Sequence, residues 1–388
     1  MMNTFDFYNP VRIHFGENSI SKLTCELEKF GPNVLLAYGG GSIKRNGIYQ
    51  AVLDSLKTAH KNVFELGGIM ANPRTEKVYE GIRMCRDHAI DFILAVGGGS
   101  VIDCSKFIAA SAKLDGDFWE ALLIGQEPIC EALPLGVVLT MAATGSEMNA
   151  TCVITHWQKH LKLAYENDLL YPRFSILDPI YTYSVPKAQM VFGCVDILSH
   201  IFEVYFSTPD TSNVSDDIAE ALMKNVMENL AVALNNPKDY TARSNILWAS
   251  SMALNGLLGL GKEQDWMGHK IEHALSAFYD VPHGAGLAVV HPVYLKYICQ
   301  KVPKKFVRYA QRIWHLDCVG KTEEVIALEG VEKTRAYFKS IGAPVTLQEI
   351  GISPEDIDAM AATIHPFPTS YAHLTQEDVK RILQQCLG

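Results

Sequence analysis

Two apolar runs in the first third of the chain end in the same four residues, Gly-Gly-Gly-Ser, and each leads directly into a helical pattern. The first run and its turn occupy residues 33–42, and the second pair occupies residues 91–100. Continuous apolar strands that alternate with helices are typical of a parallel sheet covered on both faces. The pattern therefore predicts an α/β fold for this part of the chain.

Further strand patterns fit the same sheet. They cover residues 11–15, 62–66, 134–139 and 174–177, and residues 151–165 are expected to form a hairpin or edge ribbon. After Pro186 the apolar residues recur at helical spacing, and no convincing strand interrupts them. We therefore predict an α/β domain with a parallel sheet over residues 1–183 and an all-helical domain over residues 184–388.

The helical half contains a candidate metal site. Asp196 and His200 are four residues apart, and His273 follows His269 by four residues, with His283 ten residues further on. On helices, each pair projects from one face. One carboxylate with imidazoles suits a divalent transition metal such as Fe²⁺ or Zn²⁺, with a position left open for substrate. Such pairs are more often surface pairs or packed core histidines, but three histidines among apolar residues favour a metal site.

The Gly-Gly-Gly-Ser turns indicate a second ligand. Glycines between a strand and a helix permit close approach of a ligand, and the free N–H groups of a helix start attract phosphate. A single turn of this kind is more often only a turn, and neither copy has the Gly-x-Gly-x-x-Gly fingerprint. Two copies after parallel strands, in a chain with a candidate metal site, favour a dinucleotide.

The first turn bears on the choice of dinucleotide. A carboxylate after an early strand commonly binds the ribose 2′-OH of NAD and repels a 2′-phosphate. Here residues 39–42 occupy that place, and Lys44 and Arg45 follow. Because nothing there repels a dianion, we predict a preference for NADPH.

Composition excludes several classes of partner. The 34 basic and 43 acidic residues give a net charge of −9, and no basic cluster offers a stripe for nucleic acid. The amino-terminal residues lack a secretory pattern, and no run of about 18 apolar residues predicts a membrane span. The nine scattered cysteines include no Cys-x-x-Cys pair, which fits reduced thiols. We expect a cytoplasmic protein without nucleic-acid or membrane partners.

The same segments resemble a known family, the iron-containing (group III) alcohol dehydrogenases. Its first signature is similar to the segment from Ser175-Ile-Leu-Asp178-Pro through Gly193-Cys-Val-Asp196 to Glu203, and its second resembles Trp266-Met-Gly-His269 through His273 to His283-Gly-Ala-Gly286. Residues 97–103 and 143–147 match the family's cofactor region. The likeness covers nearly the whole chain, and it is closest to the NADPH-dependent butanol dehydrogenase and broad-range aldehyde reductase branch.

The resemblance implies a dehydroquinate synthase-like fold, in which a dinucleotide-binding α/β domain precedes an all-α domain. It implies that the metal is bound by Asp196, His200, His269 and His283, and that His273 lies near the reaction centre. It further implies cofactor contacts from Gly40, Ser42, Asn72, Gly98, Gly99, Ser100, Asp103, Thr140, Thr144, Asn149 and Lys162.

The function expected from this resemblance is hydride transfer between NADP(H) and short- to medium-chain aliphatic alcohols or aldehydes. His273 is expected either to relay a proton or to support the ligand helix. The alternatives are a glycerol dehydrogenase-like polyol oxidoreductase and a non-catalytic protein that binds a nucleotide or metal. A homodimer is the default expectation, with the amino-terminal strand as a pairing edge.

Overall fold

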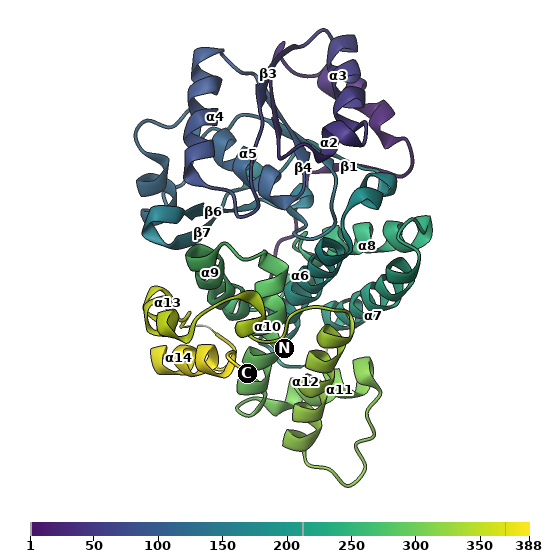
Figure 1. Cartoon of the computed structure of the whole chain (residues 1–388), viewed down its shortest axis with the longest axis vertical. Helices are drawn as coiled ribbons and strands as arrows, with labels where there is room; N and C mark the ends of the chain where they lie inside the picture. The colour runs from purple at the N-terminus through teal and green to yellow at the C-terminus, as the bar shows by residue number, and fades with distance from the viewer. Residues whose placement is uncertain (1, 212, 369) are drawn as a thin grey trace. The chain divides into compact units, whose positions relative to one another are not determined.

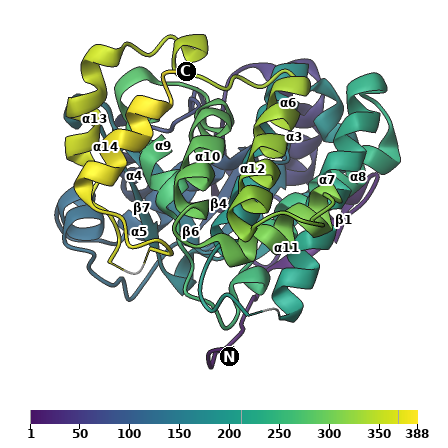
Figure 2. The ribbon, with the colours of Figure 1, turned by 90° about the horizontal axis from the view of Figure 1, so that it is seen from below.

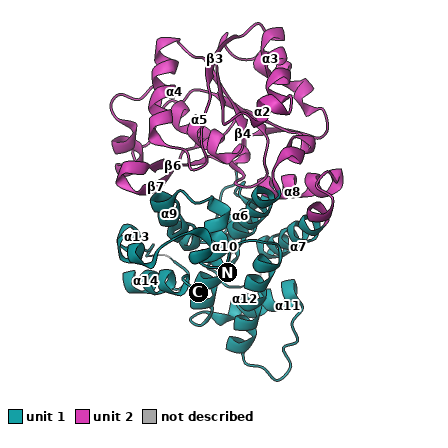
Figure 3. Ribbon diagram, in the orientation of Figure 1, with its two compact units in different colours: residues 1–7, 187–231, 252–388 teal, residues 8–186, 232–251 magenta. Residues whose placement is uncertain are grey.

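The computed structural model describes residues 2–211, 213–368 and 370–388. The chain groups into two compact units, which Figure 3 colours separately. Unit 1 comprises Met1–Phe7, Lys187–Ala231 and Met252–Gly388, and unit 2 comprises Tyr8–Pro186 and Val232–Ser251. The division into domains 1–183 and 184–388 stays a prediction, which limited proteolysis tests.

Unit 2 is built on a six-stranded sheet in the order β1-β8-β5-β4-β2-β3, and every neighbouring pair is parallel. Figure 1 labels β1, β3 and β4 of this sheet. Its strands are β1 Arg12–Phe15, β2 Asn33–Tyr38, β3 Asn62–Leu66, β4 Phe92–Gly97, β5 Leu135–Leu139 and β8 Phe174–Leu177. An antiparallel pair, β6 Thr151–His156 and β7 Leu161–Glu166, follows the fifth strand. The parallel sheet and the hairpin predicted from the sequence are both confirmed.

The sheet carries a hydrophobic core on each face. In β2, Leu35 and Ala37 belong to the core that includes α4 and α5, whereas Val34 and Leu36 belong to the core that includes α1 and α3. Successive side chains of a strand point to opposite faces, so burial on both faces requires an uninterrupted apolar run. The helices are α1 Leu23–Leu27, α2 Ser42–Arg45, α3 Ile48–Thr58, α4 Thr75–Asp87 and α5 Gly99–Ser111.

Unit 1 is helical, as predicted. The helices from residue 187 onward are α6 Lys187–Tyr205, α7 Val214–Asn235, α8 Tyr240–Ala253, α9 Met267–Tyr279, α10 His283–Cys299, α11 Pro303–Trp314, α12 Glu323–Ser340, α13 Ile357–Thr363 and α14 Gln376–Gln385; most of α8 belongs to unit 2. Among the described residues after 186, β pairing is limited to an isolated bridge between Thr208 and Glu263. None of the described helices has the length and apolar content that crossing a membrane requires.

Short 3₁₀ or π segments connect these elements. They are η1 Ser19–Lys22, η2 Trp119–Ile124, η3 Ser146–Met148, η4 Trp157–Lys159, η5 Asp168–Leu170, η6 Pro179–Ser184, η7 Leu257–Gly259, η8 Gln348–Ile350 and η9 Pro354–Asp356.

Helix α10 forms the centre of unit 1. It lies between α9 and α12 and also contacts α6 (Figure 2). Every residue from Gly284 to Leu295 is buried, which is typical of a helix that is apolar all round. A Cβ atom at Gly284 would lie 2.1 Å from the carbonyl oxygen of Phe192 in α6. Only glycine permits this approach of the two helix backbones.

Candidate metal centre and cofactor edge

The metal candidates predicted from the sequence converge within unit 1. Asp196 and His200 lie one turn apart on α6, His269 lies near the start of α9, and His283 is the first residue of α10. Oδ1 of Asp196 lies 3.7, 3.8 and 3.6 Å from Nε2 of His200, His269 and His283, respectively. Residues from three helices therefore point at one place.

The spacing of these atoms fits a small cation better than it fits hydrogen bonds. Distances of 3.6–3.8 Å between N and O are too long for a hydrogen bond. Ligand atoms around a tetrahedral ion with bonds of about 2.1 Å are separated by about 3.4 Å. Oδ1 of Asp196 and Nε2 of His269 are buried and have no hydrogen-bond partner among the described residues. Orphaned buried polar atoms are costly, and a divalent ion would satisfy them.

Burial and mutual charge interactions shift the pKa values of the residues in this cluster. Burial raises the pKa of the Asp196 carboxyl, but the facing His200 and the other two imidazoles outweigh burial and hold that pKa below its ordinary value. Burial lowers the pKa of His200 to about 4, so this imidazole is neutral at neutral pH. Burial also acts to lower the pKa of His269, but the carboxylates of Asp196 and Glu203 outweigh it and raise that pKa to about 9. The Asp196 carboxylate is therefore ionised at neutral pH and faces three imidazoles, which is a suitable arrangement for binding a cation.

His273 lies beside the cluster and closer to solvent. It follows His269 by one turn on α9, and its ring centroid is 5.7 Å from that of His283. His273 is partly exposed, whereas Asp196, His200 and His269 are buried. This placement suits a group that exchanges protons between the cluster and water.

The structure gathers the candidate phosphate-binding residues at the carboxyl ends of neighbouring strands. Helix α5 begins at Gly99, and its N-cap residue, Gly98, supplies no side-chain cap to the first N–H groups. Thr140 follows β5, and its N–H donates to Gly97 at 3.0 Å. A Cβ atom at Gly99 would lie 2.3 Å from Oγ1 of Thr144, so that side chain lies directly against the helix start. With Gly98 and Ser100, these residues form a polar, uncapped edge.

Four of the remaining cofactor candidates lie in unit 2 as two pairs. Gly40 and Ser42 follow β2, the strand next to β4. Nζ of Lys162, on β7, lies 3.0 Å from Oδ1 of Asn72, and both residues are buried.

Asp103 and Asn149 take part in a buried internal network. Asp103 accepts hydrogen bonds from Oγ of Ser146 at 2.6 Å and from N–H of Val153 at 3.1 Å. Oδ1 of Asn149 accepts from Nζ of the fully buried Lys106 at 3.0 Å. Both side chains hold the chain after β5 against α5, which is a supporting role.

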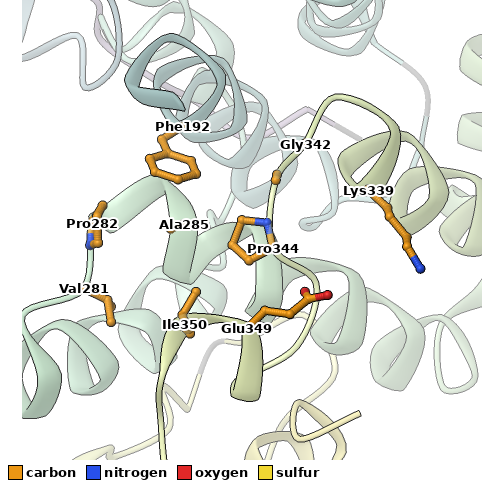
Figure 4. A pocket seen from close by; sticks show the side chains of 10 residues that line it. Phe192, Val281, Pro282, Ala285, Lys339, Gly342, Pro344, Glu349 and Ile350 are labelled. Carbon is orange, nitrogen blue, oxygen red and sulfur yellow. The ribbon is translucent and has the colours of Figure 1, made fainter. Parts of the chain in front are cut away.

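A surface pocket of roughly 500 Å³ lies elsewhere in unit 1 (Figure 4). Its walls come from α6, the residues at the start of α10, the end of α12 and the segment that follows α12, and they include Phe192, Pro282, Ala285, Lys339 and Glu349. No member of the carboxylate and histidine cluster lines it. The pocket is therefore not the candidate metal site.

Two buried glutamates that sequence reasoning assigned no role lie behind the histidines. Glu203 lies 2.8 Å from Nδ1 of His269, and Glu272 is hydrogen-bonded to Nδ1 of His283. A sequence signal for them exists, because Glu203 continues the face of Asp196 at i+7 and Glu272 lies at i+3 from His269. Each is a charged residue within an apolar helical pattern.

Two models of one protein family match the chain over most of its length. Residues 10–179 match the family model described as iron-containing alcohol dehydrogenase, and residues 190–387 match the C-terminal model of the same family. The chain belongs to the iron-containing alcohol dehydrogenase family.

Individual relatives resemble the chain along its length. It is 43% identical over 388 residues to the probable NADH-dependent butanol dehydrogenase 1 of Bacillus subtilis, with 100% of both chains covered. It is 37% identical to the NADPH-dependent aldehyde reductase YqhD of Escherichia coli, with 92% of each covered. The crystal structure of NADH-dependent butanol dehydrogenase A from Thermotoga maritima superposes with a TM-score of 0.96 at 39% identity, covering 100% of this chain and 99% of that one.

Proposed function

We propose that the protein is a metal-dependent alcohol dehydrogenase and aldehyde reductase that transfers hydride between NADP(H) and short- to medium-chain aliphatic alcohols or aldehydes. In this proposal Asp196, His200, His269 and His283 hold one Fe²⁺ or Zn²⁺ ion. The observation that carries the proposal is the buried, unpartnered Oδ1 of Asp196, which faces three imidazole nitrogens at 3.6–3.8 Å. Membership of the family and the names of the relatives support the reaction class.

A divalent cation at this site would supply Lewis acidity toward a carbonyl or alcohol oxygen, beside a nicotinamide that carries the hydride. The chain's own residues perform the remaining tasks. The buried histidines exclude water, and the neutral His200 offers a lone pair rather than a competing proton. His273, partly exposed and one turn from His269, exchanges the proton between substrate oxygen and solvent.

For the cofactor, we propose that the uncapped start of α5, with Gly98, Gly99 and Ser100, binds the pyrophosphate. Asp103, Thr140, Thr144, Asn149, Lys162 and Asn72 hold or support the remainder, and Gly40 and Ser42 surround the adenosine ribose. A preference for NADPH is supported by the lack of a carboxylate in residues 39–42 and by Lys44 behind them. The names of the relatives include both cofactors, so the KM values for NADPH and NADH decide this point.

The decisive experiment combines metal analysis of anaerobically purified protein with NADPH oxidation by aldehydes of increasing length. We expect about one Fe or Zn per chain and activity that depends on the aldehyde's chain length. Glycerol oxidation exceeding aldehyde reduction would instead favour a polyol oxidoreductase. Cofactor binding without turnover of any aldehyde would favour a non-catalytic protein.

We also propose a cytoplasmic homodimer. No disulfide joins the nine cysteines, all of which lie in the described part of the chain, and this supports a reducing compartment. Strand β1 lies at an edge of the sheet, and its Phe15 is 40% exposed, which supports pairing there. Sedimentation equilibrium of wild-type protein and of Phe15→Glu tests the dimer; a monomeric wild type would contradict it.

A further inference from the structure

Two of the histidines that face Asp196 have a buried carboxylate on their other side. Oε1 of Glu203, which is 1% exposed, lies 2.8 Å from Nδ1 of His269 and accepts a 2.7 Å hydrogen bond from the backbone N–H of the same residue. Oε2 of Glu272, which is 0% exposed, is hydrogen-bonded to Nδ1 of His283, and its Oε1 accepts from Oγ of Ser276. The two carboxylates stand in the same relation to the two rings.

This relation determines which nitrogen of each ring is protonated. An ionised carboxylate only accepts hydrogen bonds, so Nδ1 of each imidazole carries the hydrogen. In the neutral form of the ring, which is the form that binds a metal, Nε2 then carries the lone pair, and Nε2 is the atom that lies 3.8 Å (His269) or 3.6 Å (His283) from Oδ1 of Asp196. A metal ion binds that lone pair, and the second hydrogen bond also fixes the ring plane.

Glu203 has a further imidazole neighbour. Nε2 of His291, a fully buried residue of α10, lies 3.4 Å from Oε1 of Glu203. The 2.8 Å contact between Glu203 and His269 has the length of a direct hydrogen bond. We therefore assign Glu203, on α6, to the support of His269 on α9, and not to direct binding of the metal ion.

A glycine lies against each carboxylate. A Cβ atom at Gly268 would lie 2.9 Å from Oε1 of Glu203 and 2.5 Å from Nε2 of His291. A Cβ atom at Gly286 would lie 2.7 Å from both Cγ and Oε1 of Glu272. Both glycines are within helices and neither has a positive φ, so the backbone conformation does not explain why glycine occupies these two positions. The space that each leaves is filled by the glutamate and, at Gly268, by His291.

We propose that Glu203 and Glu272 are positioning residues that set the tautomer and orientation of His269 and His283. Gly268 and Gly286 are required because a methyl group at either position would displace the carboxylate. The inference rests on the proposed metal function of Asp196, His200, His269 and His283. It adds four residues through which metal affinity is controlled without direct contact with the ion.

The test measures binding of Co²⁺ to the full-length protein after its metal has been removed. Affinity comes from competition with a chelator, and the visible absorption of bound Co²⁺ reports ligand geometry. Glu203→Gln and Glu272→Gln keep the shape and an acceptor oxygen but lose the charge, and each should weaken binding about 10- to 100-fold. Gly268→Ala and Gly286→Ala remove no polar group, yet each should weaken binding and alter the absorption spectrum.

Gly330→Ala is the matched control. Its added Cβ would lie 2.9 Å from Cβ of Ala310, between α11 and α12, so it crowds the same unit away from the histidines. It should lower the unfolding temperature of the metal-free protein while leaving Co²⁺ affinity and spectrum unchanged.

The outcomes separate this inference from the proposed function. Co²⁺ binding by both glutamine variants within twofold of wild type, with unchanged spectra, would overturn the positioning roles while leaving the metal site intact. Failure of the wild-type protein to bind one Co²⁺ would instead refute the metal site. If Glu203→Gln does not fold, Glu272→Gln and Gly286→Ala still decide the case, because they act on the partly exposed His283.

Discussion

The proposed metal centre of unit 1 is assembled from side chains, whereas the proposed phosphate site of unit 2, at the start of α5, is assembled largely from backbone and glycine. In unit 1, Asp196 and three histidines are specific chemical groups, and two buried glutamates hold two of the rings. In unit 2, the N-cap residue of α5 is Gly98, which has no side chain to cap the first N–H groups, and Gly99 leaves space for the side chain of Thr144. Truncating a single ligand should therefore remove the first kind of site, whereas the second kind, which has few side chains to truncate, is disturbed mainly by added atoms.

The largest effect should follow from His269→Ala, which tests whether the centre depends on side chains. Removing this imidazole should abolish metal retention and with it activity, because only the Asp196 carboxylate and two imidazoles would remain and the truncation would leave a cavity at a buried position. Metal content by mass spectrometry measures this. His365→Ala, at an exposed position of the same unit, is the control. Full metal content and full activity in His269→Ala would remove the basis for the site.

His273→Ala should have a smaller effect of a different kind. Because His273 is partly exposed and not among the four proposed ligands, the variant should keep its metal while kcat falls about 100-fold. Added imidazole should restore part of kcat if the lost group moved a proton. Loss of metal from this variant would show that His273 supports the ligand helix instead.

Gly99→Ala tests the other side of the comparison by adding a single carbon. Its Cβ would lie 2.3 Å from Oγ1 of Thr144, and the resulting shift should raise KM for the cofactor about tenfold while metal content stays unchanged. Gly136→Ala crowds the ring of Phe174 within the same sheet and should lower stability without this change in KM. An unchanged KM in Gly99→Ala would exclude the start of α5 as the phosphate site.

The smallest effect is expected from replacing Lys44, the positively charged residue that follows the glycine turn at residues 39–42. Nζ of Lys44 lies 4.9 and 4.6 Å from the ring centroids of Tyr38 and Tyr49, whose hydroxyls donate to Glu65. Lys44→Ala should raise KM for NADPH about two- to fivefold and leave KM for NADH unchanged, with Lys57→Ala as control. Equal changes for both cofactors would mean that Lys44 does not recognise the 2′-phosphate.

Short-range periodicity predicted much of this structure. The continuous apolar runs identified the parallel strands, and the alternation at residues 151–165 identified the hairpin. The i, i+4 spacing placed Asp196 and His200 on one face because an α-helix repeats every 3.6 residues. That His283 begins a helix also agrees with the small residues that follow it.

Contacts between residues far apart in the sequence could not be predicted from short-range periodicity. Glu203 contacts a residue 66 positions away, and nothing in local spacing specifies how α6 meets α9. The return of residues 232–251 to unit 2 and the place of β1 beside β8 likewise depend on tertiary contacts. The roles of Gly268 and Gly286 required knowledge of which atoms occupy the space that a side chain would fill.

The approach of α10 to α6 at Gly284 has a practical consequence for protein engineering. The two helices meet there through backbone atoms, so the distance between two of the helices that carry the proposed metal ligands does not depend on a side-chain rotamer at that point. Side chains elsewhere in the unit can thus be exchanged to admit bulkier or more polar substrates without changing the packing of α6 against α10. Libraries that vary the surrounding walls but leave residue 284 untouched should retain a higher proportion of working catalysts.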